Sequence, residues 1–341
     1  MTNKIIVITG QTATGKTQLA LEYAKKYNGE LVNCDSRQIY KKLNIITGKD
    51  INENQKSKIK NQKFNEIKVI NNFHIGYYSL TSNYSLQPTY SNLLTKLWLY
   101  DIVDPKEYFS SYDYVQCAQT VIKDILSRKK TPIIIGGTGL YLKHLLYGFD
   151  YAVQPNWPLR LKLGKKTLKQ LQDILQKLII RASKQSFQPP GLKIVSQQSK
   201  HTSLLTINNS DFNNPRRLIR RIEILSSPSI PNLPNLPNYP NVKLISLKYK
   251  NKTDLINAIQ IRVEKRLKQG AIEEVKNLLS FGYTEDDPGL KTIGYQQIIQ
   301  YLKNKLTKEE ATQQWITAEV QYAKRQVTFL NKLPNIQWKY I

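Results

Sequence analysis

The chain of 341 residues carries 51 lysines and arginines against 25 aspartates and glutamates, a formal net charge of +26 that favours a polyanionic partner such as nucleic acid. No apolar run is long enough to span a membrane, no secretion-signal pattern opens the sequence, and the two cysteines, Cys34 and Cys117, lack metal or disulfide-framework spacing. Membrane proteins and disulfide-stabilised secreted domains are therefore excluded, and we expect a cytoplasmic protein with one large domain and an insertion, or with two domains.

The first predicted element is a buried strand, an apolar run over residues 4–9. It leads into Gly-x-x-x-x-Gly-Lys-Thr, and an amphipathic helix pattern follows over 16–27. A glycine loop between a strand and a helix is typical of a P-loop, whose backbone N–H groups wrap a phosphate at the positive helix N-terminus. Lys16 adds a point charge and the Thr17 hydroxyl can ligate Mg²⁺. The predicted phosphate-binding residues are Gly10, Thr12, Ala13, Thr14, Gly15, Lys16 and Thr17.

The next elements alternate between strand and helix. A strand over 30–33 precedes Asp35, and a polar excursion over 50–98 with a hairpin around 73–78 follows. A strand is predicted over 98–103, a helix over 110–128, and a strand over 132–135 that ends in a glycine turn. Such alternation predicts a parallel α/β sheet covered by helices on both faces. Ligands bind at the carboxyl ends of such strands, so the P-loop, Asp35 and Thr138 should converge there.

The polar residues at these strand ends allow two interpretations each. Asp35 suits a general base or an Mg²⁺ ligand, but it could also be a helix N-cap or a turn residue. Thr138 could hydrogen-bond a reacting group or simply belong to a glycine-rich turn. Asp101 and Asp104 follow apolar residues and could imitate the Mg²⁺-binding aspartate of an NTPase, but they are interpreted as turn or cap residues.

The second half of the chain is mostly helical and strongly basic in its first part. Residues 151–225 hold fourteen lysines and arginines against three acidic residues, and an arginine cluster at 216–221 occupies two helical faces. A proline-rich linker over 232–241 precedes a strand at 243–247 and helical patterns at 253–281, 292–302 and 307–332.

Together these elements predict an α/β fold, a P-loop-containing parallel sheet flanked by helices, with a mainly helical insertion domain and a helical C-terminal part. The boundaries that we expect are 1–155 for the core, 156–212 for the basic insertion and 213–341 for the remainder of the core.

Motifs in a fixed order along the chain resemble those of the tRNA dimethylallyltransferases (tRNA isopentenyltransferases) of the bacterial type. The resemblance covers roughly two-thirds of the chain. Beyond the P-loop, the matching segments are Asp35–Tyr40, Asp101–Pro105, Gly136–Tyr141, Asn214–Glu223, Arg262 with Gly270–Val275, Thr292–Tyr295 and Tyr322–Gln326.

The resemblance implies transfer of a dimethylallyl group from dimethylallyl diphosphate to the exocyclic amine of the adenosine 3′-adjacent to the anticodon. The P-loop would hold the diphosphate leaving group, with Lys16, Mg²⁺ on Thr17 and Arg262 neutralising its charge. Asp35 would take the proton from the amine and Thr138 would orient the reacting groups. The target base would leave the anticodon-loop stack to reach the site.

The family's tRNA contacts carry over onto matching positions, and we expect a monomer that grips the anticodon stem-loop. These positions are Asp35, Ser36, Arg37, Gln38, Thr138, Arg160, Arg216, Arg217, Arg220, Lys291, Thr292, Ile293, Gly294, Tyr295, Gln296, Lys324, Arg325 and Gln326. Three alternatives stay open at this point: an adenylate isopentenyltransferase acting on free nucleotides, a P-loop small-molecule kinase, and a non-catalytic RNA-binding protein.

Overall fold

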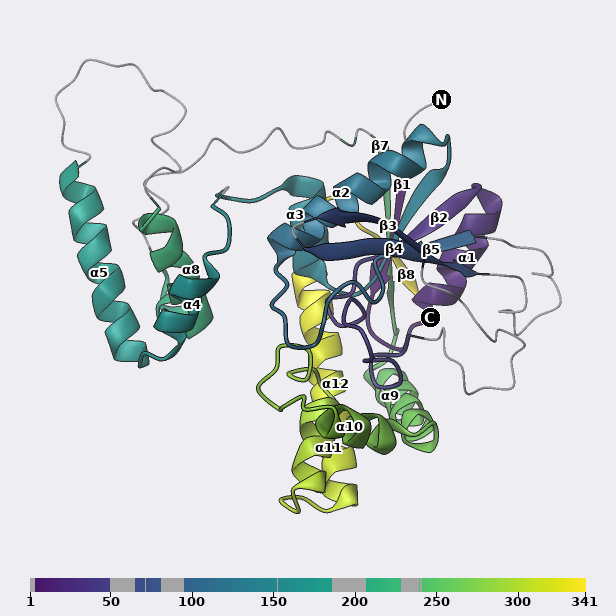
Figure 1. The fold of residues 1–341 in the computed structure, drawn as a ribbon. Helices are drawn as coiled ribbons and strands as arrows, with labels where there is room; N and C mark the ends of the chain where they lie inside the picture. Colours follow the sequence, from purple (N-terminus) through teal and green to yellow (C-terminus); the bar gives the residue numbers. More distant parts are fainter. Residues whose placement is uncertain are drawn as a thin grey trace. The chain divides into compact units, whose positions relative to one another are not determined.

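A computed structural model describes residues 4–49, 65–70, 72–80, 95–151, 153–185, 207–227, 239 and 241–341. Its contacts divide the chain into two compact units, Met1–Tyr147 with Pro237–Ile341, and Gly148–Leu236. Figure 1 shows the helices and strands of each unit. The second unit is longer at both ends than the insertion expected over 156–212, and that boundary is corrected here. The reason is that α8 (Pro215–Leu225) packs against α4 (Trp157–Gly164) and α5 (Leu168–Gln185).

In its described residues, the first unit is built on an eight-stranded sheet in the order β3-β4-β5-β2-β6-β1-β7-β8. The six strands in the order β5-β2-β6-β1-β7-β8 are parallel to one another, as the α/β alternation predicts. β3 and β4 form an antiparallel hairpin, and β4 also pairs antiparallel with β5. The hairpin arises from the polar excursion, and β4 contains the predicted 73–78 segment. The strands are β1 (Lys4–Gly10), β2 (Gly29–Asn33), β3 (Asn65–Ile70), β4 (Phe73–Leu80), β5 (Thr95–Trp98), β6 (Thr131–Ile135), β7 (Asn241–Lys248) and β8 (Gln337–Tyr340).

The strand predicted over 98–103 is wrong in its position. β5 ends at Trp98, because Leu99 and Asp101 have φ angles of 65° and 56°, which extended backbone does not allow. Only an isolated bridge between Tyr40 and Val103 continues the pairing. Asp104 is the turn residue that the sequence suggests, since its Oδ1 accepts the Lys106 N–H at 3.0 Å.

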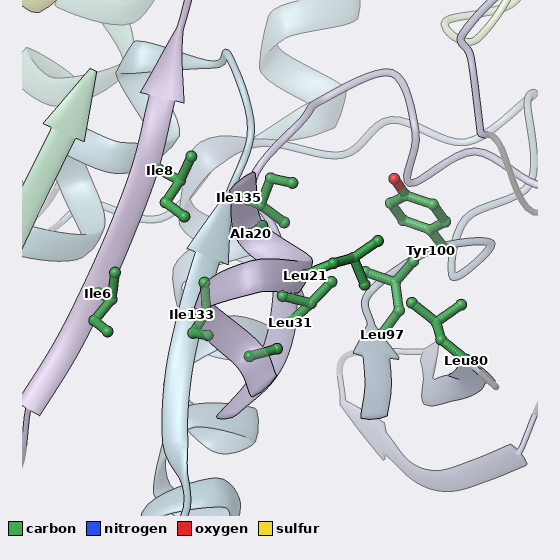
Figure 2. Packing of buried hydrophobic residues seen from close by; sticks show 11 residues of the cluster. Ile6, Ile8, Ala20, Leu21, Leu31, Leu80, Leu97, Tyr100, Ile133 and Ile135 are labelled. Atoms are coloured by element: carbon green, nitrogen blue, oxygen red, sulfur yellow. The ribbon is translucent and has the colours of Figure 1, made fainter. Parts of the chain in front are cut away.

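Helices cover both faces of this sheet. On one face, α1 (Lys16–Lys26) inserts Ala20 and Leu21 against Ile6, Ile8 and Ile133 (Figure 2). Successive strand residues point to opposite faces, so the intervening residues of β2 and β6 face α2 (Ser111–Ser127), which contacts both strands. α3 (Gly139–Tyr147) packs on α2. Burial of these near-continuous apolar strands on both faces is what stabilises a parallel sheet.

The C-terminal part of this unit is helical, as predicted, with one strand that the sequence pattern does not indicate. The segment 253–281 contains α9 (Lys252–Lys268) and α10 (Ala271–Ser280), and α11 (Tyr295–Leu302) and α12 (Lys308–Leu330) follow. β8 is short and exposed, and it is held by parallel pairing with β7. None of the helices in the described segments is both long and apolar enough to cross a lipid bilayer.

The second unit is a small helical cluster in its described residues. α4, α5 and α8 bury a leucine- and isoleucine-rich core, with the short helix α7 (Asn209–Phe212) packed on α8. Asn156 and Asn214 cap α4 and α8, since their side chains accept the N–H groups of Leu159 and Arg217. The proline-rich segment 232–241 falls mostly outside the described residues, as does the glutamine- and serine-rich stretch before α7.

Candidate active site

The P-loop connects the end of β1 to the start of α1. Gly15 caps the helix with a φ of 74°, a left-handed conformation that favours glycine. The Lys16 ammonium lies over the loop and donates to the carbonyl oxygens of Gly10, at 3.3 Å, and Gln11, at 2.5 Å. Burial, reinforced by the nearby charge of Arg262, lowers the pKa of Lys16 to about 7. The loop is therefore an electropositive cradle at a helix N-terminus, which suits a phosphate group.

Thr12, at the tip of the P-loop, is held from two C-terminal helices. The guanidinium of Arg262, on α9, donates to Thr12 Oγ1 at 2.5 Å. The side-chain carbonyl of Gln326, on α12, accepts the Thr12 N–H at 2.9 Å. A third contact comes from Tyr249, whose hydroxyl donates to the Ala13 carbonyl oxygen at 2.6 Å. The C-terminal part of the chain thus holds the P-loop in shape.

Asp35 and Thr138 lie on adjacent loops that follow β2 and β6. The Ser36 N–H donates to Thr138 Oγ1 at 2.9 Å, and the Thr138 hydroxyl donates to Ser36 Oγ at 3.2 Å. Asp35 Oδ1 accepts the Arg37 N–H at 2.8 Å, so one carboxylate oxygen closes a turn, as one of the two interpretations of this residue anticipates. No hydrogen bond from another described residue occupies its second oxygen.

The sheet register brings the three predicted loops to one edge. Val7 of β1 and Val32 of β2 both lie opposite Ile134 of β6, and all three strands run in the same direction. Their carboxyl ends are therefore level, and the P-loop, Asp35 and Thr138 share that edge. The charge of Asp35 raises the pKa of Lys16, partly offsetting the effect of burial. A carboxylate and the phosphate cradle therefore lie at the same edge of the sheet.

Tyr322 is a site residue that sequence reasoning did not assign to the chemistry. Burial and then the negative charge of Asp35 raise the pKa of this phenol, and Thr138 is its hydrogen-bonding neighbour. The side chain therefore lies beside Thr138, within reach of the charge of Asp35. The signal for it is in the sequence: Tyr322 opens the Tyr-Ala-Lys-Arg-Gln motif and stands four residues, about one helical turn, before Gln326.

The residues expected to contact RNA in the first unit differ widely in exposure. Lys291 is exposed, but Thr292 and Tyr295 are buried, and the Tyr295 hydroxyl donates to Glu274 at 2.5 Å. Gln296 donates to the carbonyl oxygens of Glu285 and Leu290. In the 291–296 segment, Lys291 is therefore exposed to solvent, whereas Thr292, Tyr295 and Gln296 anchor the segment to the protein.

Three further candidates of that set also differ in exposure. Gln38 donates to the carbonyl oxygens of Thr47 and Gly48 and accepts from the Tyr100 hydroxyl, so its amide is used inside the protein. On α12, Lys324 and Arg325 are exposed.

In the second unit, Glu223 organises the arginines. Its buried carboxylate accepts hydrogen bonds from Arg160 at 2.9 and 2.7 Å and from Arg220, and Arg160 stacks over Trp157 at 4.9 Å. These contacts, together with the Asn156 N–H, lower the pKa of Glu223 against the opposing effect of burial. Arg160 and Arg220 thus stabilise the unit, whereas Arg216 is exposed on α8.

Arg217, next to Arg216, pairs with Asp211 of α7 while more than half of its side chain stays exposed. Of the four arginines predicted to contact tRNA in this unit, Arg216 and Arg217 thus present their charge to solvent.

Comparison with known proteins gives a consistent result over the whole chain. A family model described as IPP transferase matches residues 87–333. A tRNA dimethylallyltransferase of Caldanaerobacter subterraneus subsp. tengcongensis is 29% identical over 348 residues, covering 100% of this chain and 93% of the relative. Another from Petrotoga mobilis is 30% identical over 341 residues, covering 98% of this chain and 93% of the relative.

Solved structures agree with these matches. The crystal structure of the full-length tRNA isopentenylpyrophosphate transferase from Bacillus halodurans is similar with a TM-score of 0.59 and 25% identity, over 99% of this chain and 90% of that one. A eukaryotic dimethylallyltransferase acting on tRNA shares the fold, with a TM-score of 0.60 and 22% identity over 99% of this chain and 74% of that one.

Proposed function

Because the chain belongs to the IPP transferase family, that of the tRNA dimethylallyltransferases, we propose that it modifies the adenosine 3′-adjacent to the anticodon. The protein is a prenyl-transferring transferase that acts on tRNA. The observation that carries the finer proposal is the shared edge of the sheet, where a P-loop, a carboxylate and a hydroxyl meet. A plain RNA-binding module has no need for a carboxylate beside a phosphate site, whereas a kinase could use one as a general base. The kinase alternative is therefore decided by the family match and by the assay below.

In the proposed reaction, the exocyclic amine of adenine attacks C1 of dimethylallyl diphosphate. An N–C bond forms, the C–O bond to the diphosphate breaks, and the amine proton passes to Asp35. The amine needs such a base because its lone pair is delocalised into the ring. Asp35 suits this role, since one oxygen is fixed by the Arg37 N–H and the other is left for the substrate. Thr138, which bonds the residue next to Asp35, and Tyr322, which neighbours Thr138, would orient the amine.

The diphosphate would bind in the P-loop, where Lys16 and Arg262 neutralise the charge that grows on the departing group. Mg²⁺ fits the same place. The described residues contain no cluster of three or more His, Cys, Asp or Glu side chains, so they provide no metal site made of protein ligands alone. Mg²⁺ instead favours one or two protein oxygens together with substrate phosphates and water. Thr17, in the first turn of α1, would supply that oxygen, and the ion would add positive charge at the leaving group.

For tRNA, we propose that the exposed cations provide the grip on phosphates. These are Lys291, Lys324 and Arg325 in the first unit and Arg216 and Arg217 in the second. Phosphate contacts of this kind position a nucleic acid without reading its sequence. A monomeric state and a cytoplasmic site of action are part of the same proposal.

The test is transfer of radiolabelled dimethylallyl from its diphosphate to unmodified tRNA. We expect wild-type protein to label tRNA in the presence of Mg²⁺, and Asp35→Asn to lower the rate by about 10²–10⁴-fold while tRNA still binds. Asparagine keeps the oxygen that accepts the Arg37 N–H, so the turn is retained and only the base is lost. Asp254→Asn, at an exposed carboxylate on α9, is the matched control and should leave the rate unchanged.

The competing activities give distinct outcomes in the same assay. Label in free AMP but in no tRNA would replace the proposal with adenylate prenylation. Phosphate transfer from ATP to a small molecule, with no prenyl transfer, would replace it with a kinase. Well-folded protein that labels neither acceptor would refute the proposal.

A further inference from the structure

Gln326 lies on α12 among residues expected to touch tRNA, yet its side chain points into the protein. Only 5% of it is exposed. Its carbonyl oxygen accepts the Thr12 N–H at 2.9 Å, and its amide nitrogen donates to the Gly137 carbonyl oxygen at 3.1 Å. One amide therefore joins the loop after β1 to the loop after β6.

The fit around this amide is close. A Cβ atom at position 137 would lie 2.1 Å from the Gln326 amide nitrogen, so a side chain there would displace it. Residue 137 is glycine, and its neighbour Thr138 carries the hydroxyl that bonds Ser36. The link needs both a donor and an acceptor at the end of a side chain of this length, which among the common residues only glutamine provides.

The two ends of the link belong to the two parts of the proposed active site, the diphosphate cradle and the loop beside the general base. Thr12 belongs to the cradle for the diphosphate, where Arg262 also holds it. Gly137 precedes Thr138, whose loop faces Asp35 through Ser36. Fixing one loop to the other fixes the separation between the leaving group and the base. Errors of about 1 Å in such a separation are enough to slow a reaction by roughly 100-fold.

We propose that Gln326 is a positioning residue for the diphosphate and for Thr138, and not a contact to tRNA. The proposal rests on the proposed function, because it takes the P-loop as the diphosphate site. The proposal also assigns different roles to neighbouring residues of α12. Lys324 and Arg325 are exposed and can contact RNA, whereas the buried Gln326 holds two loops of the active site in place.

The test separates diphosphate binding from tRNA binding. Gln326→Met keeps the length of the side chain and removes both hydrogen bonds, and Gln326→Glu keeps the acceptor for Thr12 but sets an oxygen against the Gly137 carbonyl. Gln321→Met, at an exposed glutamine of the same helix, is the matched control. The measurements are the dissociation constants for dimethylallyl diphosphate with Mg²⁺ and for tRNA, each by titration calorimetry, the transfer rate at saturating substrates, and the melting temperature.

We expect Gln326→Met to weaken diphosphate binding about tenfold to 100-fold, because two buried groups lose their partners, with tRNA affinity within about twofold of wild type. Gln326→Glu should lower the saturated rate about tenfold or more at unchanged tRNA affinity. The inference is overturned if either variant weakens tRNA binding more than it weakens diphosphate binding, or if both variants match wild type in all four measurements. If Gln326→Met fails to fold, the same comparison on Gln326→Glu decides the question. Failure of the proposed function itself would appear separately, as wild-type protein that does not transfer the prenyl group.

Discussion

Lys16 should take up a proton when the P-loop binds a diphosphate. In the ligand-free loop its pKa is about 7, because burial and the Arg262 charge disfavour the ammonium. A diphosphate beside Lys16 favours the charged form and raises that pKa. Above pH 7 the free protein must therefore bind a proton in order to bind the ligand, and affinity falls as the pH rises.

The magnitude follows from the fraction of free protein that carries the ammonium. With a pKa of about 7 this fraction is about 0.9 at pH 6 and about 0.1 at pH 8, so affinity should drop about tenfold between these values. At pH 8 binding should take up about 0.9 proton per site on the same reasoning. Calorimetric titration with dimethylallyl diphosphate in buffers of different ionisation enthalpy measures that number directly.

The control is Lys16→Arg, because a guanidinium stays charged throughout this range. Its titration reports the protonation of the ligand alone, and the difference from wild type reports Lys16. If wild type and Lys16→Arg show the same uptake and the same slope with pH, Lys16 is already charged in the free loop and the reasoning is refuted.

Three further predictions concern other parts of the molecule. Arg262→Ala should weaken diphosphate binding by about tenfold to 100-fold in the same calorimetric assay, since Thr12 loses a charge-assisted partner, and an unchanged dissociation constant would contradict the cradle described above. Arg128→Ala should lower the free energy of unfolding by about 3 kcal/mol in a urea titration, because it strips a partner from the fully buried Glu30. The pKa of Glu30 is lowered to about 2 despite its burial, so its stabilisation is present above its ordinary pKa of 4.5 and is lost as the pH falls toward 2, and the variant should show a flatter acid limb. Arg216→Ala should weaken tRNA binding and reduce the slope of log K against log salt by about one at unchanged melting temperature, whereas an unchanged slope would remove this residue from the phosphate contacts.

The pattern of strands and helices in the first half of the chain was predictable because it depends on local signals. About a dozen residues are enough to recognise a buried apolar run, a glycine loop or an amphipathic helix. Accordingly, α1 and α2 match their predicted ranges to within a residue or two. The P-loop and the strand-end position of Asp35 follow from the same pattern, since parallel strands place their carboxyl ends together.

Other features depend on contacts between distant residues and leave weaker traces in the sequence. β5 ends before the predicted strand end at residue 103, because Leu99 and Asp101 adopt left-handed backbone conformations that the sequence pattern does not indicate. β8 is a mostly exposed strand that exists by pairing with β7. The extent of the second unit was not predicted because the arginines of α8 indicate a basic surface helix. In the structure, the apolar face of this helix packs against α4 and α5.

The sequence also does not distinguish residues that bind a substrate from residues that hold the site in shape. Arg160 and Arg216 are both arginines in a basic segment, but only the first has a buried carboxylate for a partner. Gln326 follows two exposed cations, and a helix turns by about 100° per residue, so adjacent positions face different surroundings. A motif therefore selects a segment, and the packing decides what each of its residues does.

In the proposed reaction, the charges around the P-loop would favour the transition state of prenyl transfer over the bound donor. Arg266 is buried next to Arg262, with both guanidinium groups approaching Gly48, and Arg266 lies 3.7 Å from Glu319 on α12. The negative charge of Glu319 also raises the pKa of Lys16, so this one carboxylate offsets a set of otherwise repelling cations. Arg262 and Arg266 are thereby held in place before the donor arrives, and Lys16 gains its charge when the diphosphate binds, so these groups need not reorganise when the C–O bond breaks. Since the departing diphosphate gains negative charge as that bond lengthens, a fixed positive site stabilises the transition state more than the ground state, which is the condition for a faster reaction.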